Sequence, residues 1–324
     1  MTLHRRALLH TLVGGAAAAA LRPAFAQLSA TPLKLVVGFP PGGAGDQFAR
    51  ILAERLQQEL QSPVLIDNKP GGGGLTAVAA FQRAKPDGST LMLHTGSTAV
   101  TAPISRKVPP YNPVDDFAWI ALLSETPFLV AVHAALPVTD LKSLVAHARA
   151  QDGKLSYGHA GLGTTVHLAA ELLKERGAFP AADIPYAGSG PALTDTIAGN
   201  VGFIVETYGT LIQHHRSGKL RIVGALATAR LPELPEVGTA REIGLDVVAG
   251  TSNLIAAPLG TPADKLTTLS QAVAKVMARP DMQQQLGALG IHGVSQSSPA
   301  EAKAYVATEV VRWTPLVKKL GIAL

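Results

Sequence analysis

The sequence contains no cysteine, and this absence removes several kinds of chemistry at once. Disulfides, thiolate metal sites, a cysteine nucleophile and a lipid anchor on an N-terminal cysteine are all excluded. Aromatic residues are scarce, at 5%, and no block of Lys and Arg interleaved with aromatics occurs. The sequence therefore predicts no nucleic-acid partner.

Familiar catalytic patterns are missing as well. Neither Ser97 nor Ser189 lies in a Gly-x-Ser-x-Gly elbow, and His214-His215 lacks the spacing of a His-Glu-x-x-His zinc site. Asp115-Asp116 is typical of a solvated turn, and no loop follows the Gly-x-Gly-x-x-Gly or Walker pattern of nucleotide sites. The sequence therefore predicts a binding protein with no cofactor, no metal and no enzymatic activity. An exported hydrolase is the less favoured alternative.

The N-terminus has the pattern of an export signal. The basic segment His4 to Arg6 precedes the largely apolar run 7–21, and Ala24-Phe25-Ala26 forms a small-x-small cleavage site. We therefore expect a signal peptide over 1–26, a mature chain that begins at Gln27, and a periplasmic protein. A transmembrane anchor is the weaker alternative, because the apolar run is too short to span a bilayer. The paired arginines leave twin-arginine and general secretory export both open.

After the signal, short β-branched runs alternate with amphipathic helices, and glycine (32) and proline (23) are plentiful between them. This alternation is typical of βαβ units and a largely parallel sheet. The apolar stretches 128–132 and 254–257 are predicted to be extended crossings between two lobes. Lobe one is then 27–131 plus 254–324, and lobe two is 132–253. The C-terminal helices are expected to pack back onto lobe one.

Hydrophobic periodicity, together with the positions of capping residues, glycine and proline, predicts the individual strands and helices. The expected strands are 33–39, 64–66, 91–93, 155–157, 184–186, 201–205 and 221–225. The expected helices are one that begins at Asp46, then 76–85, 140–149, 166–176, 191–199, 263–278, 281–289 and 300–320.

Four loops rich in glycine or hydroxyl groups each connect a predicted strand to a predicted helix: 39–46, 68–76, 159–165 and 187–191. In an open parallel sheet, such loops lie at the carboxyl ends of the strands, where ligands bind. Each loop also offers backbone N–H groups at a helix N-terminus, which favours an anion without a basic side chain. For any single loop, the alternative is that its glycines only make a tight turn.

The most specific of these loops is Gly161 to Thr165, where two hydroxyls lie beside backbone donors at a helix start. The alternative for Thr164 or Thr165 is a plain N-cap. His167 falls in the first helical turn, where it either faces the cleft or packs. Asp195 either orients donors in the loop before it or favours the positive end of its helix.

Six ordered motifs carry a resemblance to a known family: Val37 to Gly43, Asn68 to Gly72, Tyr157-Gly158 through His167-Leu168, Pro185-Tyr186 with Gly188 and Pro191-Ala192, Gly218 to Arg221, and Ala257 to Pro262. With them, essentially the whole mature chain resembles the extracytoplasmic solute receptors of the tripartite tricarboxylate transporter family, the Bug or TctC group. Three positions depart from the family pattern: His159 replaces a small hydroxyl residue, Gly202 an Asp, and Ser252-Asn253 an aromatic. These departures concern the identity of the ligand rather than the fold.

The resemblance implies an α/β, two-lobed, type II periplasmic-binding-protein fold, each lobe a mostly parallel sheet flanked by helices. It implies that loops 39–43 and 161–165 hold a ligand carboxylate, partly through waters, while loops 95–98 and 188–195 shape the pocket. The implied partners are a small-molecule ligand and the membrane subunits of a tripartite tricarboxylate-type transporter, with a monomeric receptor that has no stable membrane insertion. A binding protein that serves a sensory system is the alternative that the sequence leaves open.

The residues predicted to bind the ligand come from both lobes. They are Phe39, Pro41, Gly42, Gly43, Thr95, Ser97, Thr98, Gly161, Gly163, Thr164, Thr165, His167, Gly188, Ser189 and Asp195.

Overall fold

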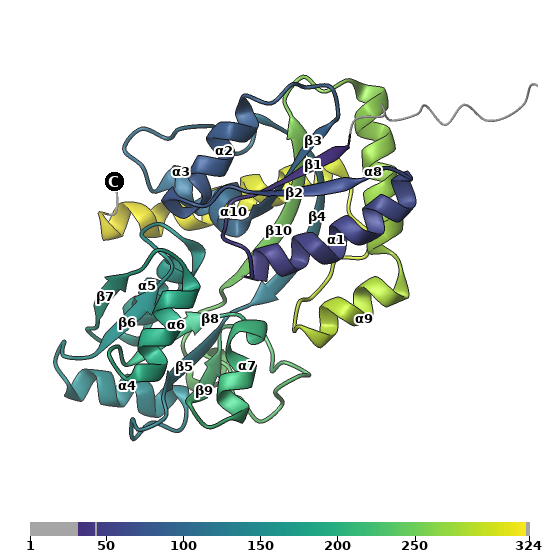
Figure 1. Cartoon of the computed structure of the whole chain (residues 1–324). Helices are drawn as coiled ribbons and strands as arrows, with labels where there is room; N and C mark the ends of the chain where they lie inside the picture. Colours follow the sequence, from purple (N-terminus) through teal and green to yellow (C-terminus); the bar gives the residue numbers. More distant parts are fainter. Residues whose placement is uncertain (1–31, 43, 322–324) are drawn as a thin grey trace, which may run out of the picture.

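The computed structural model describes residues 32–42 and 44–321. Two five-stranded sheets, each with its own helices, form an upper and a lower lobe (Figure 1). The predicted signal peptide 1–26, the predicted start at Gln27 and the predicted site residue Gly43 lie outside the described residues. Over the part that is described, no helix has both the length and the apolarity needed to cross a membrane.

Lobe one is built on a sheet with the strand order β2-β1-β3-β10-β4. Its strands are β1 (Leu33–Val37), β2 (Val64–Asn68), β3 (Thr90–Thr95), β4 (Phe117–Pro127) and β10 (Gly250–Pro258). β1 pairs in parallel with β2 and β3, whereas β10 lies antiparallel between β3 and β4. All strands of this sheet except β10 therefore run in one direction, as the predicted βαβ units require.

Helices cover both faces of the lobe-one sheet. They are α1 (Ala44–Leu60), η1 (Gly72–Gly74), α2 (Leu75–Gln82), η2 (Ser97–Thr101), α3 (Ala102–Ile104), α8 (Ala263–Met277), α9 (Pro280–Ala288) and α10 (Pro299–Leu320). Leu35 of β1 packs with Phe48 of α1 and Val273 of α8 on one face, whereas the adjacent Val36 packs on the other face with Phe81 of α2. Both faces are buried, which explains the continuous apolar run of β1. The C-terminal helices do pack onto lobe one, as predicted.

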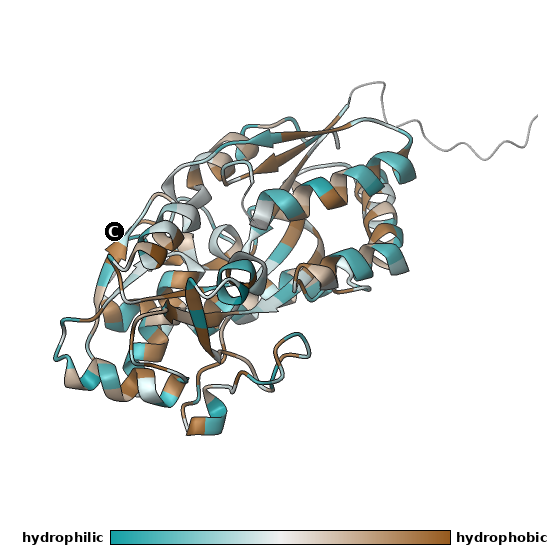
Figure 2. Cartoon of the chain, turned by 60° about the horizontal axis from the view of Figure 1, so that its bottom comes forward, coloured by the Kyte–Doolittle hydropathy of each residue, from teal (hydrophilic) through white to brown (hydrophobic). Residues whose placement is uncertain are grey.

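Lobe two repeats this arrangement with the strand order β7-β6-β8-β5-β9. Its strands are β5 (Leu129–His133), β6 (Ser156–His159), β7 (Ala182–Pro185), β8 (Phe203–Glu206) and β9 (Leu220–Ala225). Its helices are α4 (Leu141–Ala150), α5 (Thr165–Gly177), α6 (Ser189–Ala198), α7 (Tyr208–Arg216) and the short η3 (Arg241–Ile243). β6 is parallel to β7 and β8, and β5 lies antiparallel between β8 and β9. Figure 2 shows hydrophobic strands inside each lobe and hydrophilic helix faces outside.

The chain changes sheets about four residues before each predicted lobe boundary, which the sequence placed at 131/132 and 253/254. Residues 128–132, predicted as a crossing, are mostly β5, a central strand of lobe two, and residues 250–253 already pair with β4 in lobe one. The predicted crossings 128–132 and 254–257 are uniformly apolar because they are buried inside a sheet, not because they bridge lobes. The two crossings lie side by side, since the Phe128 N–H donates to the Ala249 carbonyl at 2.9 Å. Neither β4 nor α7 was among the elements predicted from the sequence.

Candidate ligand-binding site

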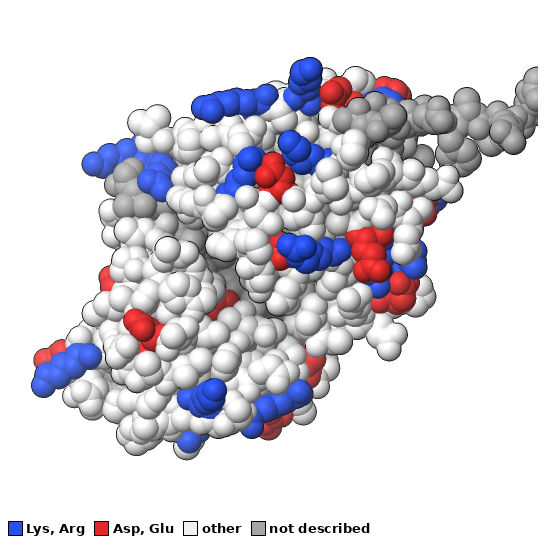
Figure 3. All heavy atoms as spheres, in the orientation of Figure 1, with Lys and Arg blue, Asp and Glu red and all other residues white. Residues whose placement is uncertain are grey.

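In each lobe, the carboxyl ends of three parallel strands meet at one edge of the sheet. In lobe one, Val37 of β1 is in register with Asn68 of β2, and β3 ends beside them at Thr95. In lobe two, His159 of β6 is in register with Pro185 of β7. The loops that leave these edges are the four loops singled out in the sequence together with 95–98. Figure 3 shows the molecular surface hollowed between the lobes.

Direct contacts show that the two edges face each other. Thr165, the first residue of α5, donates its N–H to the Ser97 hydroxyl at 3.2 Å, and the two hydroxyl oxygens are 3.3 Å apart. A Cβ on Gly163 would lie only 2.7 Å from the Cβ of Ser105, so the lobe-two loop approaches lobe one too closely for a side chain there. Ser97 and Thr165 thus join the lobes, instead of both pointing free donors at a ligand.

A buried carboxylate anchors the first loop of lobe one. Asp46 is 1% exposed and accepts from the Gly42 N–H at 2.9 Å, from Arg50 at 2.8 Å and from the Asn68 amide at 3.0 Å. Burial alone would raise the pKa of Asp46, but these hydrogen bonds and the charge of Arg50 hold it below the usual value. The Gly42 N–H, expected to be free for a ligand, therefore has a partner in its own loop.

Other groups of this loop have different surroundings. The Phe39 carbonyl accepts from the Asn68 amide at 3.0 Å, and its side chain is half-buried. Pro41 and Gly42 are exposed. The loop therefore presents an exposed tip on a base that Asn68 and Asp46 hold in place.

The loop after β3 contains the clearest unused hydrogen-bonding group. Thr95 Oγ1 is buried and has no hydrogen-bond partner. Buried polar groups nearly always have hydrogen-bond partners, so this unpaired hydroxyl is a group at the edge that is available to bond a ligand. Thr98 has a different role: its hydroxyl accepts the Thr95 N–H at 3.0 Å, and its carbonyl accepts the Tyr111 hydroxyl at 2.6 Å. The segment Ser97–Thr101 forms a π-helical turn, a wide geometry found often at functional sites.

In lobe two, two histidines accept hydrogen bonds from backbone N–H groups of the Gly161–Thr165 loop. The Gly161 N–H donates to His159 Nδ1 and the Gly163 N–H donates to His167 Nδ1, both at 3.2 Å. Thr164 occupies the N-cap position of α5, but its hydroxyl donates to the Gly161 carbonyl at 2.7 Å and accepts no N–H of the helix. His167 is 2% exposed, so it packs inside the lobe and does not face the cleft.

The loop before α6 is also tied to its own lobe. The Ser189 hydroxyl donates to the buried Glu206 carboxylate, which also accepts the Thr207 N–H at 3.2 Å. Burial raises the pKa of Glu206, and these hydrogen bonds offset part of that rise. Gly188 has φ 130° and open space around its missing Cβ, so it serves the backbone turn and not a close contact.

Asp195 fits neither role that the sequence suggested. It lies in the middle of α6 and accepts the Tyr186 hydroxyl at 2.6 Å and the Asn200 amide at 3.2 Å. Its hydrogen bond with Tyr186, with a smaller effect of burial, raises the pKa of that phenol to about 12. Asp195 therefore stabilises the ends of its own helix-loop unit.

Five residues that hold the cleft loops or pack against them were missed as site residues: Asp46, Asn68, Ser105, His159 and Glu206. Three of them share a signal that the sequence does contain. Asn68, His159 and Glu206 are each the last residue of a strand at the ligand edge. A polar residue at the carboxyl end of a strand is the pattern that would have found them.

Comparison with known proteins now decides the family. The model of the tripartite tricarboxylate transporter family receptor matches residues 48–322. The chain belongs to this family. The receptor is 30% identical over 297 residues to the protein BugT of Bordetella pertussis, with 91% of each chain covered. It is 32% identical over 290 residues to a protein from the tcbD-tcbE intergenic region of a Pseudomonas strain, covering 88% of the receptor and 85% of the relative.

Solved structures show the same architecture. The periplasmic binding protein BugD superposes on the receptor with a TM-score of 0.84 at 30% identity, covering 90% of the receptor and 98% of BugD. Rpa4515 of R. palustris, solved with adipate, gives 0.86 at 29% identity over 90% and 98%. MatC of Rhodopseudomonas palustris, solved with malate, gives 0.81 at 30% over 88% and 98%. The predicted two-lobed periplasmic-binding-protein fold is confirmed.

Proposed function

We propose that this receptor binds a small carboxylate between its lobes in the periplasm and delivers it, chemically unchanged, to the membrane subunits of a tripartite tricarboxylate-type transporter. Family membership supports the receptor role, and the adipate and malate in Rpa4515 and MatC support the ligand class. The observation that carries the proposal is the meeting of six strand ends across one hollow, with the unpaired Thr95 hydroxyl at its edge.

The proposed binding site contains fewer residues than the set predicted from the sequence. Thr95 offers a free hydroxyl, and Pro41 and Gly42 offer an exposed loop tip. Ser97, Thr165 and the anchors behind them shape the floor of the cleft. A hydrogen bond from the neutral Thr95 hydroxyl to a ligand carboxylate contributes about 1.5–3 kcal/mol.

Export and closure complete the proposal. The mature receptor begins at Gln27 after cleavage, with lobe one as 32–127 plus 250–321 and lobe two as 128–249. Because the crossings touch at Phe128 and Ala249, we place the hinge there and expect the lobes to close on the ligand. Small-angle scattering of the mature receptor should show a smaller radius of gyration with saturating ligand.

The substitution Thr95→Val tests the site, because it replaces the unpaired hydroxyl with a methyl group of the same shape. Calorimetry with the copurified carboxylate should show a tenfold to hundredfold loss of affinity, which corresponds to about 1.4–3 kcal/mol. Urea denaturation of the ligand-free variant should show unchanged or greater stability, since a buried hydroxyl without a partner is unfavourable. The exposed Thr267→Val is the matched control. Equal affinity of Thr95→Val and the parent would show that the ligand lies elsewhere.

A further inference from the structure

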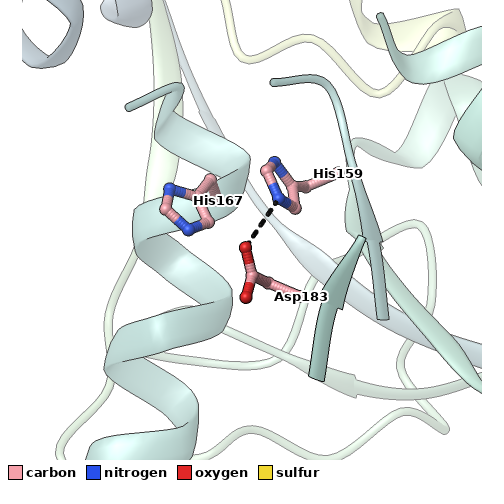
Figure 4. Close-up of side chains that lie close together, drawn as sticks. All are labelled: His159, His167 and Asp183. Atoms are coloured by element: carbon pink, nitrogen blue, oxygen red, sulfur yellow. Dashed lines mark ion pairs between the residues drawn. The ribbon is translucent and has the colours of Figure 1, made fainter. Parts of the chain in front are cut away.

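Behind the lobe-two loop, two histidines and an aspartate form a cluster (Figure 4). His159 ends β6, His167 lies in the first turn of α5, and Asp183 extends from β7. The two imidazole rings are stacked, with centroids 4.3 Å apart and an angle of 24° between their planes. The histidines are 1% and 2% exposed. A buried, stacked pair of titratable rings directly under a binding loop calls for an explanation.

A shared metal ion is the first explanation to test, because one ligand atom from each residue lies within 4.8 Å of the others. Imidazole binds zinc in the plane of its ring, at about 2.0–2.1 Å from nitrogen. The lone pairs of two nearly parallel, stacked rings point side by side, so one ion cannot lie on both. Ring stacking therefore disfavours a metal in this arrangement.

The hydrogen bonds define the protonation of the pair instead. His159 Nδ1 accepts from the Gly161 N–H and His167 Nδ1 accepts from the Gly163 N–H, each at 3.2 Å. A nitrogen that accepts carries no proton, so each neutral ring has its proton on Nε2. His159 Nε2 lies 3.6 Å from the Asp183 carboxylate. A metal on Nε2 would require the proton on Nδ1, where the loop amide now points.

Burial, more than the surrounding charges, keeps both rings neutral near pH 7. The pKa of His167 is lowered to about 4, mainly by burial and also by the nearby His159 and Lys174, while Asp183 opposes them. Burial also lowers the pKa of His159, against the backbone hydrogen bond with Gly161 and the carboxylates of Asp183 and Glu171, which raise it. The Tyr157 ring packs beside His159, and its hydroxyl donates to Glu171 at 2.6 Å.

We propose that His159 and His167 are positioning residues that set the Gly161–Thr165 loop through their unprotonated Nδ1 atoms. The proposal rests on the proposed function, since this loop forms one side of the ligand cleft. A proton on either Nδ1 would set a donor against a donor and push the loop away. Thr165, which joins Ser97 across the cleft, lies in the same loop, so its placement depends on the histidines.

The first test needs no ligand. Long-range ¹H–¹⁵N spectra of the mature receptor with ¹⁵N-labelled histidine report which ring nitrogen carries the proton. At pH 7.5 we expect His159 and His167 to be protonated on Nε2 alone. A proton on Nδ1 of either ring would overturn the proposal, and so would a shift of both Nε2 signals with micromolar ZnCl₂.

The second test compares variants with and without an acceptor. In His159→Asn and His167→Asn the amide oxygen replaces Nδ1 and does not titrate, whereas Leu at either position removes the acceptor. With malate and adipate as probes at pH 7.5, we expect parent-like affinity in the Asn variants and about tenfold weaker binding in the Leu variants. His133→Leu, at the end of β5, is the matched control. A Leu variant that lowers the melting temperature but binds like the parent would reduce the histidines to a purely structural role.

The third test uses pH. Between pH 7.5 and pH 4.0, the parent should lose at least about threefold more affinity than the double Asn variant, a ratio that cancels the titration of the probe itself. Identical pH profiles would contradict the proposal. Failure of the parent to bind either probe at any pH would count against the proposed function, and the tautomer spectra would still decide the role of the histidines.

Discussion

The two lobes fix their cleft loops with opposite chemistry. In lobe one, a carboxylate does this: Asp46 binds the Gly42 amide, Arg50 and Asn68. In lobe two, neutral imidazoles bind the Gly161 and Gly163 amides. A carboxylate anchor needs to stay charged and an imidazole anchor needs to stay uncharged. The comparison therefore predicts that the two lobes differ in how much stability the loss of an anchor costs and in how that stability changes in acid.

The largest effect is expected at the lobe-one anchor. Asp46→Ala leaves the Gly42 amide and the Asn68 amide without their partner, so we expect a loss of about 3 kcal/mol in the free energy of unfolding. Loss of the ion pair with Arg50 adds little to this loss of stability, because the Arg50 side chain is mostly exposed and water replaces its partner. Urea denaturation measures the loss. Asp46→Asn, which keeps an acceptor but not the charge, is the control and should lose less. An Asp46→Ala variant as stable as the parent would show that Asp46 does not hold the loop.

The acid response should come next in size. Because the folded-state pKa of His167 is about 4 and the usual value is 6.5, the unfolded chain binds the proton first. The stability from neutral His167 is complete above about pH 6.5 and is lost as the pH falls toward 4. Between pH 7 and pH 5 we expect the parent to lose about 2 kcal/mol more than His167→Asn.

The control for this pH experiment is His147→Asn on α4, which should follow the parent. Asp46 does not interfere, since its pKa lies below 3.8 and its contribution is lost only in stronger acid. His94, in the core of lobe one with a pKa of about 3, adds a loss of the same sign to every variant and cancels in the difference. If His167→Asn loses stability as steeply as the parent, the imidazole anchor does not distinguish the lobes.

The contact between the lobes should matter less than either anchor. Ser97→Ala leaves the Thr165 N–H buried and without its acceptor, which we expect to cost about 1 kcal/mol of stability. Ser97→Thr keeps the hydroxyl and serves as the control in the same urea titrations. A Ser97→Ala variant as stable as the parent would mean that water fills the contact.

The smallest effect is expected at Asp195, a half-buried acid of lobe two. Asp195→Asn should cost about 0.5 kcal/mol, because water replaces the lost hydrogen bonds. Its spectroscopic effect should be clearer: the pKa of Tyr186, raised to about 12 mainly by Asp195, should fall toward 10. Ultraviolet titration of the phenol, with Asp183→Asn as control, measures this. An unchanged titration would assign the shift to burial.

The sequence predicted the alternating strands and helices because their signals are local. The β1 run with its glycine loop and the capped start of α10 depend on neighbouring residues only. β4 was missed because its run is broken by Ser124 and Glu125 and becomes a strand only by pairing with β10, over 100 residues later. α7 was missed because it is short and follows a threonine with no side-chain cap.

The site was predicted by position but not by role. The loops at the strand ends are where the sequence placed them, since parallel topology fixes that edge. Which side chain bonds each loop amide depends on side-chain geometry. Asp46, in the first turn of α1, accepts from the Asn68 amide at the end of β2, and the His159 ring stacks on the His167 ring of α5. No pattern in the sequence specifies which amide a side chain will accept. Loop amides that seemed free for a ligand were therefore already paired.

The account depends most on a carboxylate bound between the lobes. A crystal structure of the mature receptor with the small molecule that copurifies from the periplasm tests this directly. We expect a carboxylate within hydrogen-bond distance of Thr95 Oγ1, enclosed by the loops 39–42 and 161–165. A ligand without an acidic group, or one bound outside the hollow between the lobes, would contradict it.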